Sequence, residues 1–128
     1  MKTSYLEDEE LDWAVAIASG TPIYRSGKSI TRMDTDGRVK WNPSMDWSQA
    51  GQFIERHKIE LAYRPRGDMR DLHGSRKPDW AAGIYNEKEY TADHICNGKT
   101  ALIAAMRCYV LSQLGDEIDV PEELSRYV

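Results

Sequence analysis

Apolar residues along this chain follow two different spacings, and each spacing predicts a different kind of element. Apolar side chains that recur every three or four residues predict helices over residues 6–18, 44–57 and 100–114. Strict alternation of polar and apolar side chains predicts strands over residues 38–41 and 59–63. Helices and strands are therefore interleaved along the sequence.

The shorter segments complete this picture. Residues 21–25 contain a proline, which is tolerated in an edge strand, and residues 79–85 are apolar enough for a further strand. Residues 26–37 are rich in turn formers and include Asp36-Gly37, a hairpin signal. We expect residues 86–99 to form a polar connection without regular structure.

The predicted helix ends carry recognisable signals. Ser4 and Glu7 have the spacing of a capping box, and Gly20 is suited to end the first helix. Either Ser44 or Asp46 is expected to cap the second helix. Four residues of that helix share one face that we expect to pack inward: Trp47, Ala50, Ile54 and His57.

The third helix has almost no polar face, which predicts a central position in the core. It ends at Gly115, and residues 122–124 form a short terminal turn. Its apolar stretch is interrupted by Arg107 and is well short of the roughly 20 residues that a membrane helix needs. The order of elements predicts one α+β domain over residues 1–128: a small, mainly antiparallel sheet with about three helices packed on it.

Charge is distributed unevenly over a chain whose net charge is −4. Residues 1–12 and 115–128 are acidic, whereas residues 25–77 carry a net +5. Within this basic middle, residues 64–78 combine five cations with glycines and prolines, and we expect a mobile loop there. An acidic chain is not expected to bind DNA strongly, and a negatively charged ligand would be held best by the middle.

Residue patterns typical of enzymes and metal sites are missing. Cys96 and Cys108 do not have zinc spacing, the three histidines do not form a ligand motif, and no serine occupies a nucleophile elbow. Gly98-Lys99-Thr100 resembles the end of a phosphate-binding loop, but Asp93 stands where that motif requires glycine. We therefore predict no cofactor, no metal and no catalytic residues.

One group of aromatic, polar and basic residues favours ligand binding. An indole offers a stacking surface for a base, arginine donates two hydrogen bonds to phosphate, and Asn or Asp can read ring edges and hydroxyls. If strands 38–41 and 59–63 are neighbours, these residues converge at one end of the sheet. The alternative is that the tryptophans belong to the core and the arginines are solvated. The candidate residues are Trp41, Asn42, Asp46, Trp47, Arg64, Arg66 and Trp80.

The chain is similar to the small phage-encoded NinX-like proteins, and the resemblance is best at Leu11–Ala16, at residues 42–59 and at residues 100–124. The resemblance implies an accessory protein of a temperate phage that acts in the cytoplasm of the infected bacterium, through host interaction or counter-defence. It supplies no catalytic residues.

Three hypotheses about function follow. The first is a non-enzymatic module that sequesters a nucleotide-type signal, in a pocket of one chain or at the interface of a homodimer, and so counters host defence. The second is an inhibitor or adaptor that binds a host or phage protein through the Arg64–Pro78 loop or the acidic ends. The third is a small nucleotide hydrolase that uses one of Asp46, Asp79 or His94.

Overall fold

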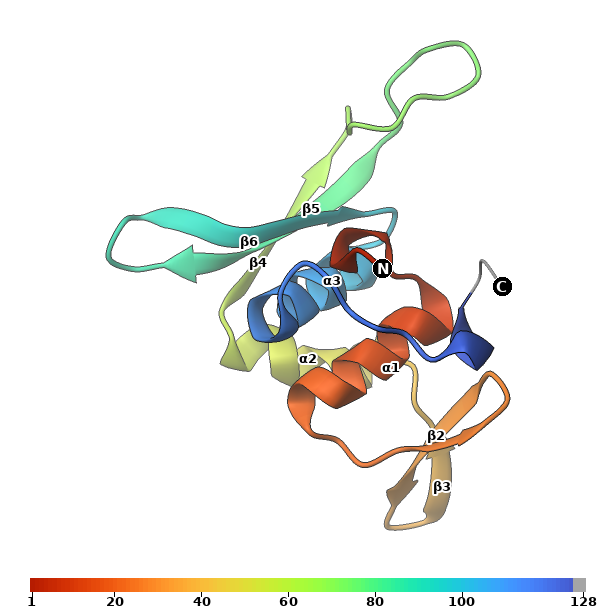
Figure 1. Ribbon diagram of the computed structural model, residues 1–128. Coiled ribbons are helices and arrows are strands. Elements are labelled where there is room, and N and C mark those ends of the chain that lie inside the picture. Colours follow the sequence, from red (N-terminus) through yellow and green to blue (C-terminus); the bar gives the residue numbers. More distant parts are fainter. Residues whose placement is uncertain (126–128) are drawn as a thin grey trace.

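A computed structural model describes residues 1–125 of the chain and has the predicted α+β class. Its strands are divided between two three-stranded antiparallel sheets, with strand orders β1-β2-β3 and β4-β5-β6. Three α-helices lie between the sheets (Figure 1). The elements are η1 (Thr3–Tyr5), α1 (Asp8–Ser19), β1 (Tyr24–Ser26), β2 (Ser29–Asp34), β3 (Gly37–Lys40), α2 (Trp47–Arg56), β4 (Ile59–Arg64), β5 (Asp79–Asn86), β6 (Thr91–Gly98), α3 (Ala101–Leu114) and η2 (Glu122–Leu124).

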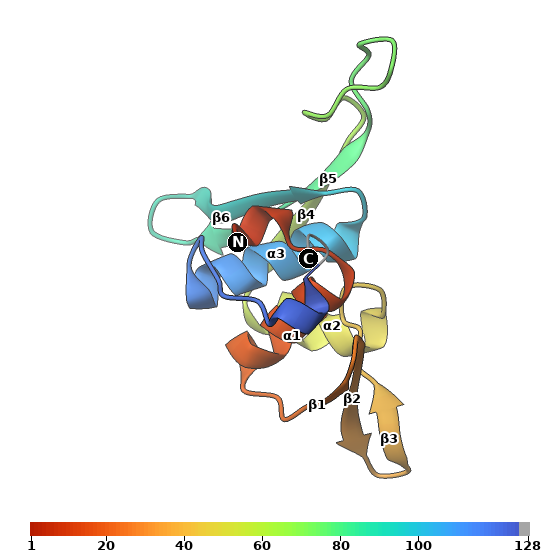
Figure 2. The same ribbon diagram turned by 45° about the vertical axis from the view of Figure 1, so that its right-hand side comes forward.

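Helix α3 is the centre of the core, as its apolar sequence predicts. All residues from 101 to 110 are buried, because the β4–β6 sheet covers one side of the helix while α1 and α2 pack on the other (Figures 1 and 2). The Thr100 hydroxyl caps its start by accepting a hydrogen bond from the Ile103 N–H at 3.1 Å. Gly115, at φ +87°, follows its last residue, in agreement with the predicted stop.

Arg107 is the one charged residue in this buried stretch, and its guanidinium joins two segments distant in sequence. It donates to the carbonyl oxygens of Leu6 and Asn97, each at 2.8 Å, and lies 3.5 Å from a carboxylate oxygen of Glu7. These contacts fix the entry into α1 against the end of β6.

The first helix begins at Asp8, later than predicted, and the predicted capping box is absent. Glu7 is the N-cap residue and makes no side-chain cap hydrogen bond, because residues 3–5 form the short helix η1 instead. Gly20, in the left-handed conformation at φ +71°, ends α1 as predicted.

The β4–β6 sheet contains one strand that the sequence pattern did not predict. β4 and β5 match the predicted strands, but residues 91–98 form β6 rather than a polar connection. The prediction was wrong because β6 is an edge strand of which only Cys96 and Gly98 are buried, so it lacks an apolar alternation.

The β1–β3 sheet likewise contains an unpredicted strand, β2, in a segment interpreted as turn-rich. The Asp36-Gly37 hairpin signal is confirmed, since Asp34 pairs with Gly37 and Gly37 has φ +113°. β2 has a single buried side chain, Ile30, which explains why its periodicity was too weak to be recognised.

Helix α2 begins at Trp47, and Asp46 rather than Ser44 caps it by accepting from the Ser48 N–H at 2.9 Å. The predicted inward face is partly wrong, because Trp47 is 56% exposed while Ala50 and Phe53 are buried. The Phe53 ring stacks on Tyr109 of α3 with 4.8 Å between centroids, and this contact sets the rotation of the helix. No helix within residues 1–125 is long and apolar enough to cross a bilayer.

Candidate functional site

The segment between β4 and β5 stands clear of the body of the protein (Figures 1 and 2). We call residues 65–78 the arm. The sequence predicts a mobile basic loop over residues 64–78, but the backbone of the arm is hydrogen-bonded across its two sides. Gly67 N–H donates to Lys77 O at 2.8 Å, Lys77 N–H to Met69 O at 2.7 Å, and Asp71 N–H to Ser75 O at 2.8 Å.

The tip of the arm is closed by Asp71. One of its carboxylate oxygens accepts from the backbone N–H groups of His73 at 2.8 Å and Ser75 at 3.0 Å. Gly74 adopts φ +81°, a conformation that suits glycine, and its carbonyl accepts from the Arg70 guanidinium at 2.7 Å. Side chain and backbone together therefore define the shape of the tip.

The base of the arm is fixed by an ion pair between the last residue of β4 and the first of β5. Arg64 donates two hydrogen bonds to Asp79, Nε to Oδ1 at 2.7 Å and Nη2 to Oδ2 at 2.6 Å. Asp68 accepts from Arg64 at 3.3 Å and from the Asn97 amide at 3.0 Å. The Arg64 guanidinium holds the pKa of the Asp79 carboxyl below its usual value. A side chain at Gly67 would collide with Asp79, since a Cβ there would lie 2.5 Å from its Cγ.

Two apolar side chains of the arm face solvent. Leu72 at the tip is 102% exposed and Met69 is 69% exposed. Arg66, one of the predicted site residues, lies on the arm near its base and is exposed. Within residues 1–125 no side chain covers Leu72, so it is available for contact with another molecule.

Among the other predicted site residues, Trp41 belongs to the core. It is 3% exposed, and its indole N–H donates to the Asp12 carbonyl at 2.8 Å. The Arg32 guanidinium lies 5.7 Å from the ring centroid. The Asn42 backbone N–H donates to the Gln49 side chain at 2.7 Å, which fixes the turn between β3 and α2.

The remaining tryptophans occupy different surroundings. Trp47 is exposed at the start of α2, where Asp46 serves as the helix cap. Hydrogen bonds from Ser48 lower the pKa of Asp46. Trp80 is half-buried in β5 and contacts Tyr63 with 5.4 Å between ring centroids.

The predicted convergence of the site residues is wrong. It required the strands that precede Trp41 and Arg64 to be neighbours, but β3 and β4 belong to different sheets. Of the seven predicted residues, Trp41 and Asn42 line a pocket beside α1, whereas Arg64 and Arg66 belong to the base of the arm.

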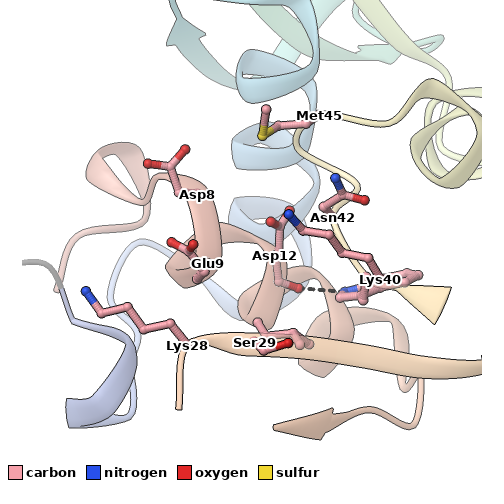
Figure 3. Close-up of a pocket in the computed structure, with 10 residues that line it drawn as sticks. Asp8, Glu9, Asp12, Lys28, Ser29, Lys40, Asn42 and Met45 are labelled. Atoms are coloured by element: carbon pink, nitrogen blue, oxygen red, sulfur yellow. Dashed lines mark hydrogen bonds between the residues drawn. The ribbon is translucent and has the colours of Figure 1, made fainter. Parts of the chain in front are cut away.

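That pocket, about 390 Å³ in volume, lies between α1 and the β1–β3 sheet (Figure 3). Its charged residues could not be grouped from the sequence, because they come from three separate segments of the chain. The full lining is Asp8, Glu9, Asp12, Lys28, Ser29, Ile30, Lys40, Trp41, Asn42 and Met45. Burial raises the pKa of Asp12 to about 6, against the opposing effect of a hydrogen bond from the Ser44 backbone N–H at 2.8 Å.

The cysteines are packed in the core and are both free thiols. Burial raises the pKa of Cys108 to about 12, which makes it a poor nucleophile. Within residues 1–125, no group of three or more histidine, cysteine or acidic side chains is arranged to hold a metal ion.

The family to which the chain belongs is decided by sequence. The family described as Bacteriophage P22, NinX matches residues 2–113 of the 128. The chain belongs to this family. The match confirms the resemblance to NinX-like phage proteins and includes both the arm and the pocket. No curated protein matches the chain.

Proposed function

We propose that this member of the NinX family is a phage accessory protein that binds a host or phage protein through the arm. The observation that carries the proposal is the fully exposed Leu72 at the tip of a hydrogen-bonded hairpin. Burying one leucine side chain in a partner contributes about 1.5–3 kcal/mol. Because the turn is held by Asp71, less conformational entropy is lost on binding than a flexible loop would lose.

The charges of the arm indicate the kind of partner surface that it fits. Arg66, Arg70, Arg76 and Lys77 outnumber the two acids of the arm, so the arm carries +2 while the rest of the chain carries −6. Both acids are already engaged, Asp71 in the turn and Asp68 with Arg64 and Asn97. An apolar pocket with an acidic rim would accept Leu72 and pair with the surrounding cations.

A protein partner is favoured over nucleic acid. Hairpin arms with basic and apolar residues also enter DNA grooves, but the body behind this arm carries −6 and would be repelled as it approached the phosphates. Sequestration of a nucleotide signal is less favoured by the geometry, because the pocket that contains Trp41 and Asn42 also contains three acidic residues. In an infected bacterium, an arm of this kind would serve to redirect or inhibit a host protein, including a defence factor.

Site-specific photo-crosslinking tests the proposal. A photoreactive amino acid is placed at Leu72 in protein produced in a bacterial host of the phage. The matched control places it at Tyr90, which is 81% exposed in the β5–β6 turn and outside the arm. We expect a discrete, nuclease-resistant adduct from position 72 that is absent from position 90. The same adducts from both positions would refute the proposal, and a nuclease-sensitive adduct would replace the protein partner with nucleic acid.

A further inference from the structure

The pocket beside α1 has a charge arrangement that the arm does not explain. Asp8, Glu9 and Asp12 lie on α1 and line the same hollow (Figure 3). Lys28, in the turn between β1 and β2, and Lys40, at the end of β3, approach it from the sheet. The pocket therefore has an acidic wall on the helix and a basic wall on the sheet.

Within residues 1–125, neither Lys28 nor Lys40 forms an ion pair with an acidic side chain of the pocket. In the part of the chain that the structure describes, the side chains of Glu9, Lys28 and Lys40 form no hydrogen bond or ion pair. Charged side chains on either side of a hollow this large can both be engaged by a molecule placed between them. At about 390 Å³, the hollow lies within the range of small-molecule sites.

The floor of the pocket is rigid and partly apolar. Asp12 is 4% exposed, and its carboxylate is oriented by the Ser44 N–H at 2.8 Å. Beside it, the Trp41 indole is held by its hydrogen bond to the Asp12 carbonyl, and Ile30 is 3% exposed. A ligand with a short carbon skeleton could contact the apolar groups while its charged ends reach the two walls.

We infer that this pocket binds a small zwitterion of amino-acid or dipeptide size, with its ammonium group toward Glu9 and Asp12 and its carboxylate toward Lys28 and Lys40. A simple amine would satisfy the acidic wall but be repelled by the lysines. A simple carboxylate or phosphate would satisfy the lysines but be repelled by the three acidic residues. Only a ligand that carries both charges pairs with both walls.

The test is a titration of the isotope-labelled full chain followed by NMR at the Trp41 indole N–H, which reports on the pocket wall. The probes are the common L-amino acids and glycylglycine, with n-butylamine and butyrate as single-charge controls. We expect at least one zwitterion to give saturable shifts and to bind about tenfold more tightly than either single-charge probe. The variants Glu9→Gln and Lys40→Gln should each weaken that binding about tenfold. Lys88→Gln, an exposed residue outside the pocket, is the control and should leave it unchanged.

Three results would overturn the inference. They are no saturable shift with any zwitterion, equal binding of butylamine or butyrate, and undiminished binding by both pocket variants. Because the arm lies outside the pocket, crosslinking from position 72 reports on the proposed function independently of these results.

Discussion

Replacing Arg107 with methionine removes a buried guanidinium that bridges two distant segments. Methionine fills much of the same volume, but it cannot donate to the Leu6 and Asn97 carbonyl oxygens, each now 2.8 Å from a guanidinium nitrogen. A buried acceptor left without a donor costs about 1–3 kcal/mol. Because Asn97 is only half-buried, water can compensate part of this loss, and we expect the free energy of unfolding to fall by about 2–4 kcal/mol.

Equilibrium urea unfolding at neutral pH measures this change directly, provided that the slope of free energy against urea is the same for both proteins. Lys99→Met is the matched control, because Lys99 is exposed and should contribute within about 0.5 kcal/mol. The variant Arg107→Lys should lose less free energy of unfolding than Arg107→Met and more than Lys99→Met, since one ammonium group cannot reproduce the forked geometry of the guanidinium. A loss below about 1 kcal/mol for Arg107→Met would refute the view that these two carbonyls depend on the guanidinium.

Three further substitutions test the core and the pocket. Because burial raises the pKa of Asp12 to about 6, the folded state holds the Asp12 proton more tightly than the unfolded chain does, and the stability that this proton contributes declines as pH rises from about 4 to 6. The melting temperature of Asp12→Asn should lack this decline. A pH profile identical to that of the parent protein would contradict the raised pKa of Asp12. Trp41→Phe should lower the free energy of unfolding by about 1–3 kcal/mol in urea titrations, because the buried indole hydrogen bond to the Asp12 carbonyl is lost and the smaller ring fills the core less well. An unchanged midpoint would show that this bond contributes nothing. Gly98→Ala should lower the free energy of unfolding by about 1–3 kcal/mol in the same assay, since the added Cβ would lie 2.6 Å from the Ala104 nitrogen of α3. A variant as stable as the parent protein would mean that β6 and α3 separate easily.

The elements with a strong periodic signal could be predicted from the sequence, and the strands with few buried side chains could not. Helix α3 is apolar on every side and β4 alternates, so both were recognised close to their true bounds. β2 and β6 have few buried side chains and resemble polar connections. Such strands are held mainly by backbone pairing with their neighbours, which leaves little trace in the pattern of side chains.

The candidate site depends on tertiary contacts that cannot be recognised from the sequence pattern alone. Trp41 and Trp47 lie only six positions apart, yet one is buried and the other is 56% exposed. The pairing of Arg64 with Asp79 follows from the register of β4 and β5, and the pocket combines residues of α1 with those of the first sheet. The basic character of residues 64–78 was visible in the sequence, but the exposure of Leu72 required the structure.

The proposal that the arm is the binding surface is tested most directly by calorimetry on the purified partner that crosslinks to position 72. Leu72→Ser should weaken binding about tenfold to a hundredfold, because it removes the apolar contact without altering the turn at Asp71. Arg76→Gln should reduce the dependence of affinity on salt, while Tyr90→Ser should leave binding unchanged. Equal affinities for the parent protein, Leu72→Ser and Tyr90→Ser would contradict the account and exclude the arm as the principal contact.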